Sequence, residues 1–524
     1  MKMPNSGTKP RCSAAAQGAF MALACLAGHV LGQQALAQSP SSTRPAYPSI
    51  ANASDAEAWR AMTRLGYGPS PALIRKLQAT PDARTWALQQ IDAAYAASQQ
   101  PPRIAPDLAA FNAPLPTLFE GGQRERQARA TLKANAQKEV DPPSARHMDF
   151  SAPPEPEHFS RAMVQQAAAW RLGSCSLPEE ENPLLARMTE FWFNHLNIYA
   201  GKGAVRPFTG HYVVNVARAH ALGKFEDLLL ASARHPAMLL YLDQARSVAE
   251  GSRGPQGSSR GLNENYAREL MELHTLGVDG GYTQTDVREL ARVLTGWTVA
   301  PRETSGFQFV PRLHDTRSKQ VLGTRFPTEL ARTGEREGED AIRMLARHPA
   351  TARRVSLRLA QFFVADQPAP ELVERLSRTF LATQGDLRAV MRTLLESADF
   401  WQPQNRLFKT PLDFACSALA ATQAAKHDTS DRRSLLQTLG FLANAGQALH
   451  GWQTPDGYKV DAATWLVPEA LTRRADFALS LGRQSPDLDF LRPYLGANTL
   501  AAIAQERPAL RAGLMLASPD FMYK

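Results

Sequence analysis

The sequence is poor in cysteine, and after its N-terminus it has no long apolar run. Four cysteines in 524 residues are too few for a disulfide-based scaffold, and no later stretch approaches the roughly 18 apolar residues that cross a membrane. A Walker lysine loop, a dinucleotide-binding fingerprint and a Cys-x-x-Cys pair are also missing. Nucleotide-hydrolase and thioredoxin-type chemistry therefore have no local support.

Extreme composition is missing as well, because 44% of the residues are apolar and 21% are charged, values typical of a folded soluble protein. The formal net charge of +9 is spread over many arginines, without a lysine-rich tract or a basic stripe interrupted by aromatics. This pattern argues against nucleic acid as a partner. It is compatible with an anionic polymer or surface.

The first 37 residues have the pattern of a secretory signal peptide. Lys2, Lys9 and Arg11 form a basic start, an apolar stretch covers residues 14–30, and Ala35-Leu36-Ala37 offers the small residues of a cleavage site. We expect cleavage to leave residues 38–524 as one large helical domain with a net charge of +6. This mature protein is expected in the periplasm or secreted, without spanning the membrane.

The cysteines are divided by this cleavage. Cys25 lies in the predicted signal peptide, where lipid attachment is a less favoured alternative to simple cleavage. Cys175 and Cys416 remain in the mature chain. In an oxidising compartment they can form one disulfide, and two separate buried thiols are an equal alternative, because the sequence does not fix their distance.

Apolar residues repeat at helical spacing through most of the chain, which predicts a mainly α fold with at most a minor β element. One helix face carries Met188, Phe191, Trp192, His195 and Tyr199, and another carries Val287, Leu290, Ala291 and Leu294. The best strand pattern, at 307–310, is short. Flexible loops rich in proline or glycine are expected near 99–106, 141–156 and 250–261.

The pentapeptide Ala-Arg-His-Pro-Ala occurs at 233–237 and again at 346–350. Each proline stands where it can begin a helix, because its fixed φ suits the first helical turn. Reuse of a common helix boundary is favoured here over duplication of a larger unit.

The most distinctive segment is 263–277, which reads Asn-Glu-Asn-Tyr-Ala-Arg-Glu-Leu-Met-Glu-Leu-His-Thr-Leu-Gly. Asn263 is a suitable N-cap and the final glycine suits a helix end, so about three α-helical turns are predicted between them. At about 100° per residue, Asn265, Glu269 and Glu272 share one polar face beside an apolar one. Two carboxylates so spaced can hold a cation, or one can raise the pKa of the other.

We therefore expect Glu269 and Glu272 to be catalytic, and Asn263, Asn265 and Arg268 to bind substrate. A structural alternative assigns Arg268 to a surface ion pair with Glu272 and leaves Glu269 as a solvated charge.

Two histidine positions are further catalytic candidates. His195 lies on an apolar helix face, where it serves as a metal ligand or general base, or alternatively as a core histidine bonded to a carbonyl. The dipeptide His314-Asp315 resembles metal-binding pairs of helical phosphohydrolases, and its alternative is a capped turn in which the aspartate bonds its own backbone. Arg292 is expected to bind an anionic substrate group.

The chain resembles a bacterial family known as domain of unknown function 1800. The resemblance is carried by 263–277, by Gly281-Tyr282-Thr283-Gln284, by Leu294-Thr295-Gly296-Trp297 and by His314-Asp315 with Lys319, and it extends from about residue 55 to the C-terminus. It implies an exported, largely helical protein without a settled activity. It also implies a partner, because genes of this family often neighbour those of a second exported family, domain of unknown function 1501.

The sequence is compatible with two functions. In the first, the protein is an enzyme, with or without a divalent metal ion as cofactor, that hydrolyses or modifies a periplasmic or cell-surface polymer. In this case the candidates around residues 195, 269 and 314 line one shared pocket. In the second, the protein is a non-catalytic, carbohydrate-binding scaffold or partner of a domain of unknown function 1501 protein, and its polar residues fix the helix packing.

Overall fold

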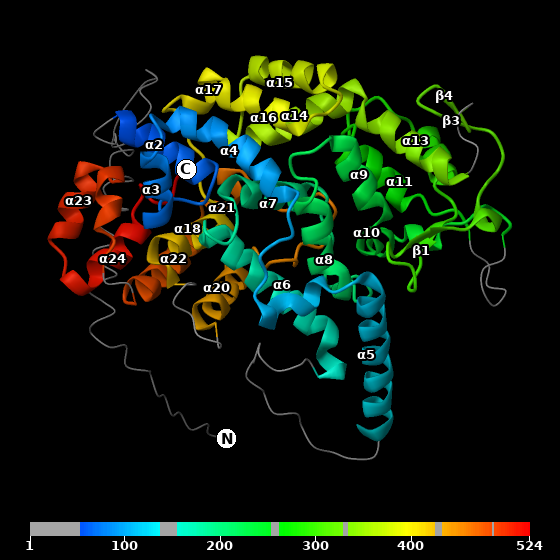
Figure 1. Ribbon diagram of the computed structural model, residues 1–524, viewed down its shortest axis with the longest axis horizontal. Helices are drawn as coiled ribbons and strands as arrows, with labels where there is room; N and C mark the ends of the chain where they lie inside the picture. Colours follow the sequence, from blue (N-terminus) through cyan, green and yellow to red (C-terminus); the bar gives the residue numbers. More distant parts are fainter. Residues whose placement is uncertain (1–52, 137–154, 253–260, 329–333, 425–431, 485–486) are drawn as a thin grey trace, which may run out of the picture. The chain divides into compact units, whose positions relative to one another are not determined.

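The computed structural model describes residues 53–136, 155–252, 261–328, 334–424, 432–484 and 487–524 (Figure 1). The predicted signal peptide, the lipid-attachment alternative at Cys25, and most of the loops expected at 141–156 and 250–261 lie outside these residues. The loop expected at 99–106 lacks regular structure as far as residue 105.

Helices make up most of the described chain. In the first half they are α2 (Ala53–Arg64), α3 (Pro71–Gln78), α4 (Ala83–Ser98), α5 (Leu115–Ala136), α6 (Phe159–Ser176), α7 (Pro183–His195), α8 (Thr209–Tyr212), α9 (Phe225–Arg234) and α10 (Pro236–Tyr241). They continue with α11 (Asn265–Glu269), α12 (Gln284–Val293), α13 (Gly334–Ala346), α14 (Pro349–Phe363), α15 (Pro370–Ala382), α16 (Leu387–Glu396), α17 (Ala398–Trp401), α18 (Pro411–Thr422), α20 (Arg433–Asn444), α21 (Ala462–Trp465), α22 (Pro468–Gly482), α23 (Ala497–Ala504) and α24 (Pro508–Ala517).

Two of the described segments are π-helices, η5 (Val213–Arg218) and η8 (Leu270–His274), and short 3₁₀ turns include η9 (Pro311–Leu313). Within the same ranges the strands form two antiparallel pairs, β1 (Trp297–Val299) with β2 (Phe307–Phe309) and β3 (Lys319–Val321) with β4 (Thr324–Phe326). The expected fold, a large mainly helical domain with a minor β element, is confirmed. None of the described helices is long and apolar enough to cross a bilayer.

The core is built around α7 and α18. α7 packs against α4, α6 and η5, and eleven of its residues are buried, including Met188, Phe191 and Trp192 of the predicted apolar face. The helix ends at His195, so Tyr199 lies beyond it. Every residue of α18 is buried, and this helix packs against α6 and α22.

A disulfide joins α6 to α18. Cys175 and Cys416 are bonded, with their Cα atoms 5.7 Å apart and a sequence separation of 241. Of the two alternatives that the sequence left open, the single bridge is the one present.

The repeated pentapeptide marks two similar helix junctions. His235 caps α10 by accepting a hydrogen bond from the Ala237 amide at its Nδ1, and His348 caps α14 in the same way. The preceding helices α9 and α13 contact each other. Arg234 of α9 forms an ion pair with Glu339 of α13, and Arg347, just after α13, forms one with Glu226 of α9. When the two pentapeptides are aligned, Arg234 corresponds to Arg347 and Glu226 to Glu339, so each copy makes the same contact with the other.

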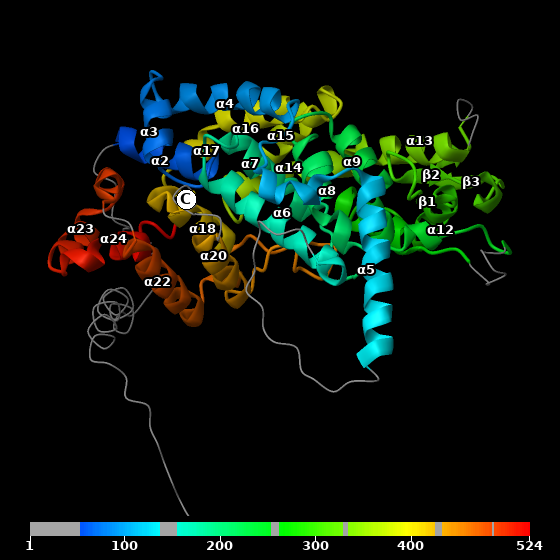
Figure 2. The same ribbon diagram turned by 60° about the horizontal axis from the view of Figure 1, so that its bottom comes forward.

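The helices α14 to α17 form the upper edge of the molecule as seen in Figure 1. α15 packs between α14 and α16, α17 follows at the end of α16, and α4 from the first part of the chain packs against α16 (Figures 1 and 2). α14 also runs past α7, because Phe362 near the end of α14 contacts Phe191, with 5.3 Å between the ring centroids. This contact places α14 beside the segment that carries the candidate site.

Candidate functional site

The distinctive segment 263–277 begins as an α-helix and continues as a π-helix. The α-helical part, α11, starts at Asn265 with Glu264 as its N-cap, so the N-cap expected at Asn263 is wrong by one residue. From Leu270 the chain widens into η8, and the Thr275 hydroxyl donates to the Leu270 carbonyl, five residues back, over 2.6 Å. Single π-helical turns are rare and occur frequently at functional sites.

The faces of this segment are those expected from the sequence. Within the helical part, Tyr266, Ala267, Leu270, Met271 and His274 are buried, and so are Thr275 and Leu276 just after it. Glu269 and Glu272 are half-buried, and Asn265 is exposed. The apolar side therefore anchors the segment in the core, while its carboxylates stay on the boundary between protein and solvent.

The C-terminal end of η8 is held by two side chains from other helices. The Leu273 carbonyl accepts a hydrogen bond from Arg354 Nε of α14 over 3.0 Å. The next carbonyl, that of His274, lies 3.1 Å from His195 Nε2 at the end of α7. Free carbonyls at a helix end favour such donors, so α7 and α14 together fix the position of η8.

His195 has the contacts of the core-histidine alternative. Its side chain is buried and lies beside the rings of Phe191 and Trp192. Burial lowers the pKa of His195 well below its ordinary value, and Arg354 and Arg358 lower it further. The imidazole is therefore neutral at pH 7, with its Nε2 proton directed at the His274 carbonyl.

A loop from the C-terminal part of the chain is attached to the end of α7. The Asn194 side chain donates to the Tyr458 carbonyl over 2.9 Å and accepts from the Tyr458 amide over 2.8 Å. Asn197 donates to the carbonyls of Trp452 and Thr454. The loop 452–458 therefore lies against the same helix end as His195.

This loop contributes a third carboxylate, Asp456. Its Oδ1 accepts from the Trp452 indole over 2.9 Å and from the Thr454 hydroxyl over 2.6 Å. Tyr241, at the end of α10, donates its hydroxyl to the Gln453 carbonyl over 2.7 Å. We call Tyr241, Glu269, Glu272 and Asp456 the carboxylate site.

The carboxyl groups of this site have opposite pKa shifts. Burial raises the pKa of Glu269, Glu272 raises it further, Arg268 opposes the rise and Asp456 adds to it. For Asp456, burial also raises the pKa, but hydrogen bonds from Thr454, Trp452 and Lys459 outweigh it and hold the pKa below its usual range. Their surroundings therefore favour the protonated form of Glu269 and the ionised form of Asp456.

The neighbouring substrate-binding candidates make local contacts. The Asn263 side chain accepts from the Asn265 amide, and Asn265 donates to the Leu242 carbonyl. Arg268 pairs with Glu264 at 3.4 Å and donates to Gln284 over 2.9 Å. The ion pair that the structural alternative assigned to Arg268 and Glu272 is therefore replaced by one with the preceding turn.

His314 belongs to a different group of charges, between α12 and α13. Its Nδ1 lies 2.9 Å from the Thr295 carbonyl and its Nε2 lies 3.3 Å from Glu337. Lys319 of β3 forms an ion pair with Glu337, and both residues are buried, with exposed fractions of 2% and 3%.

Asp315 is equally occupied. It accepts from Arg292 Nε over 2.9 Å and from Arg317, and its Oδ1 accepts from the Arg317 amide, which is the capped turn named as the alternative. Burial raises its pKa, but hydrogen bonds from Arg317 and Arg292 lower it well below the usual value. Arg292 also forms a two-point ion pair with Glu289. We call Arg292, His314, Asp315, Lys319 and Glu337 the charge network.

The structure therefore brings together part of the expected pocket. His195 contacts the segment that carries Glu269 and Glu272, at the His274 carbonyl, and Asp456 of the loop 452–458 is close enough to Glu269 to raise its pKa. The other candidates belong to the charge network, where Arg292 binds Asp315 directly and His314 lies against Glu337. In the described part of the chain, the catalytic candidates do not form a group of three metal-ligand atoms.

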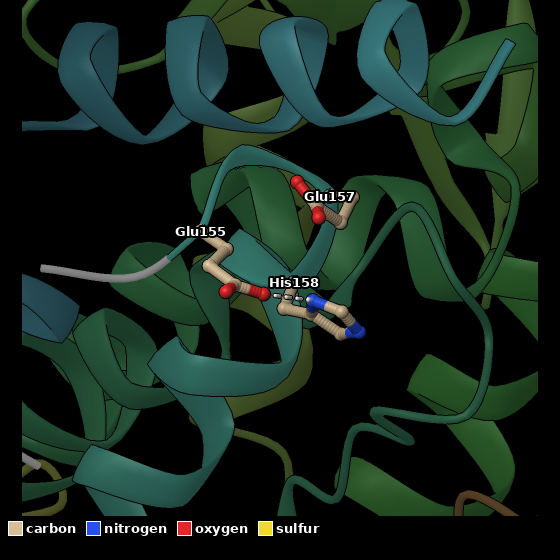
Figure 3. Close-up of side chains that lie close together, drawn as sticks. All are labelled: Glu155, Glu157 and His158. Atoms are coloured by element: carbon tan, nitrogen blue, oxygen red, sulfur yellow. Dashed lines mark ion pairs between the residues drawn. The ribbon is translucent and has the colours of Figure 1, made fainter. Parts of the chain in front are cut away.

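One such group exists elsewhere among the described residues. Glu155, Glu157 and His158 offer ligand atoms within 4.8 Å of one another just before α6, and Figure 3 shows Glu155 directed at the His158 ring. All three follow one another closely in sequence, and Glu155 and His158 are about half exposed, at 47% and 54%. Exposed acidic groups of this kind are common without an ion.

Comparison with known proteins identifies the family. The model of the family described as "Protein of unknown function (DUF1800)" matches residues 60–523. The chain belongs to the DUF1800 family. No curated protein and no solved structure matches it.

Several residues of this DUF1800 protein escaped prediction. Asp456 and Tyr241 lie far from 263–277 in sequence, and only the tertiary contacts bring them to Glu269. Arg354 and Arg358 carry a weak sequence signal, since they lie four residues apart on a helix whose next residue at that spacing is Phe362. His195 and the π-helical segment, by contrast, lie in stretches that the sequence singled out.

The DUF1800 chain also has a large groove away from the carboxylate site. It encloses about 900 Å³, and its lining includes Arg75, Pro102, Leu108, Trp170 and Leu435. This size is within the range of ligand-binding clefts.

Proposed function

We propose that this protein is an exported enzyme that hydrolyses a glycan polymer outside the cytoplasm, with Glu269 as the proton donor. The observation that carries the proposal is the pair of carboxyl groups, Glu269 and Asp456, whose surroundings shift their pKa values in opposite directions within one half-buried site. Such a separation is how one site supplies both an acid and an ionised carboxylate near neutral pH.

The reaction uses groups that are present in the carboxylate site. Protonated Glu269 gives its proton to the glycosidic oxygen as the bond from that oxygen to the anomeric carbon breaks. Water supplies the oxygen that bonds to the anomeric carbon, and its released proton passes to an ionised carboxylate, Asp456 or Glu272. Trp452 and Tyr458, with ring centroids 4.7 Å apart, offer aromatic surface beside Asp456 for a sugar ring.

Export is part of the same proposal. It is supported by the signal-peptide pattern of residues 1–37 and by the Cys175–Cys416 disulfide, because stable disulfides are typical of oxidising compartments. Expression of the full chain in a Gram-negative host tests it. We expect a periplasmic product that begins at Gln38 and has no free thiol, and a reduced cytoplasmic product of full length would contradict it.

Activity is tested with residues 38–524, disulfide intact, on a panel of neutral and acidic glycans, with new reducing ends as the readout. Glu269→Gln should lower the rate at least about 100-fold, because a general acid contributes on that scale. The control Asp279→Asn changes an exposed carboxylate on the loop after η8 and should leave the rate unchanged.

The pH profile adds a second readout. Activity should fall as the pH rises through the raised pKa of Glu269, since the proton donor is then lost. Equal rates for Glu269→Gln and Asp279→Asn on a cleaved glycan would contradict the assignment.

A second function, a carbohydrate-binding scaffold for a partner such as a domain of unknown function 1501 protein, is favoured by the groove lined by Trp170 and Leu108. It is distinguished by binding without cleavage. If Trp170→Ala abolishes glycan binding while Glu269→Gln leaves it intact and no glycan is hydrolysed, the scaffold replaces the enzyme.

A further inference from the structure

Three residues of α14 form a stripe that runs along the candidate site. Arg354, Arg358 and Phe362 are spaced by four, so they share one face of the helix. The stripe is fixed at both ends, because Arg354 donates to the Leu273 carbonyl of η8 and Phe362 contacts Phe191 of α7. Arg358 therefore lies between these contacts, facing the end of α7.

The two arginines of this stripe have N–H groups to spare. Arg354 uses only its Nε, and Arg358 donates no hydrogen bond to any residue that the structure describes. Both side chains are half-buried. A guanidinium offers five N–H donors, so a half-buried one without a carboxylate partner is costly unless something else satisfies it.

Other arginines near the candidates are occupied. Arg292 is held by Glu289 and Asp315, and Arg268 by Glu264 and Gln284. The two residues that sequence reasoning assigned to an anionic substrate group thus have their own partners. Of these four described arginines, Arg354 and Arg358 of α14 are the two with N–H groups left open.

We propose that Arg354 and Arg358 together bind an oxyanion carried by the substrate, so that the polymer is an acidic glycan bearing carboxylate or sulfate groups. The inference rests on the proposed function for the nature of the polymer. Paired guanidinium groups suit such anions, because parallel N–H bonds match two oxygens at once.

Electrostatics agree with this geometry. Burial lowers the pKa of Arg354 and the charge of Arg358 lowers it further, while Tyr282 and Glu272 compensate only in part. Burial lowers the pKa of Arg358 as well, and Asp456 only partly compensates. The carboxylates of Glu272 and Asp456 therefore balance the two guanidinium charges only in part, and a bound anion would add negative charge to the pair.

The test measures binding without turnover, using the Glu269→Gln protein and calorimetry. One pair of probes is oligogalacturonate and its fully methyl-esterified, neutral form; the other is dextran sulfate and dextran. We expect the charged member of at least one pair to bind about tenfold more tightly or better, and which pair responds tells carboxylate from sulfate.

Adding Arg358→Gln should remove this preference and leave the neutral probes unaffected. The matched control is Arg353→Gln, which removes an exposed arginine from the neighbouring position of α14 and should keep the preference. The inference is overturned if neither charged probe binds more tightly than its neutral form. It is also overturned if both substitutions reduce binding equally, since the surface charge alone would then explain it.

A second measurement avoids the substitution should Arg358→Gln fail to fold. Phenylglyoxal modification of the Glu269→Gln protein, mapped by mass spectrometry, should show protection of Arg358 by the preferred charged probe and none of Arg353. Protection of neither, or of both alike, counts against the site. Because these readouts need no cleavage, they fail independently of the hydrolysis assay.

Discussion

The carboxylate site and the charge network are both groups of acidic and basic residues in a helical protein, but they are balanced differently. In the charge network, Asp315 has two arginine partners and Glu337 has Lys319. In the carboxylate site, Glu269 has a carboxylate neighbour on its own segment and another on the loop. Charges are matched in one region and crowded in the other.

This difference separates structural from chemical roles better than residue type does. The dipeptide His314-Asp315 has the composition of a catalytic pair, yet its atoms are used by the fold. Glu269 lies in a run of residues that matches no known catalytic motif, yet its surroundings disfavour its negative charge. Crowded like charges lower stability, and they persist where function needs a shifted pKa.

Breaking the charge network should give the largest effect. Lys319→Met leaves Glu337 buried without its cation, and we expect a loss of about 3–5 kcal/mol in the free energy of unfolding, measured with urea. The control Arg378→Gln removes an exposed ion pair with Glu374 and should change stability by less than about 1 kcal/mol.

The double variant Lys319→Met/Glu337→Leu sharpens this test. Replacing both charges leaves no unpaired ion, so it should be more stable than Lys319→Met. A double variant that is less stable than the single one would show that Glu337 acts through other contacts.

Asp315→Asn should have an intermediate effect that depends on pH. The folded-state pKa of Asp315 is depressed, so its charge contributes stability above the unfolded pKa of about 4 and this contribution is lost as the pH falls. At pH 7 we expect a loss of about 1–3 kcal/mol, and the difference from wild type should shrink below about pH 4. A constant difference across this range would contradict the assignment.

Neutralising Glu269 should act in the opposite direction. Its folded-state pKa is raised, so the stability that it contributes is present at low pH and is lost as the pH rises through that pKa. Glu269→Gln should therefore equal or exceed the wild-type stability at pH 7, by at most about 1 kcal/mol, in the same urea experiment. A clear loss would place Glu269 with the structural charges.

The smallest effect is expected for Arg268→Gln. Its pair with Glu264 is about one-third exposed, at 38% and 32%, and such pairs contribute about 0.3–0.5 kcal/mol. The loss should decrease further in 1 M salt, where exposed charges are screened. Chemical unfolding at two salt concentrations measures it, and a loss that persists in salt would indicate a packing role.

Much of the fold could be predicted because it follows local periodicity. Val287, Leu290, Ala291 and Leu294 share a fully buried face, as their spacing requires, and the short strand at 307–310 forms over Phe307–Phe309. Such patterns record which side of an element is buried, and burial is set largely by the residues themselves.

The π-helical turn at Leu270–His274 could not be predicted in this way. Its residues suit an α-helix equally well, and the wider turn is fixed by contacts from Arg354 and His195, which are distant in sequence. It also explains the wrong partner expected for Arg268. Within a π-helix, residue 272 no longer lies one turn above residue 268, so Glu264 on the α-helical side is the closer carboxylate.

The candidate site was predictable only on one side. Glu269 and Glu272 lie in a conspicuous run, whereas Asp456 lies on a loop whose place depends on Asn194 and Asn197. Which charges pair is likewise decided by the tertiary structure, because the residues around His314-Asp315 in the sequence do not indicate that Glu337 will lie next to His314.

The attachment of η8 has a mechanical consequence. Its last two carbonyls contact side chains from two different helices, Arg354 of α14 and His195 of α7. This end is therefore held in place at two points, unlike a free helix terminus. An anion that drew the Arg354 guanidinium toward itself would weaken the hydrogen bond to the Leu273 carbonyl and leave the contact between His195 and the His274 carbonyl in place. Binding of an anion to the α14 arginines would then shift η8 and its acidic side chains, Glu269 and Glu272, before any bond of the substrate is broken.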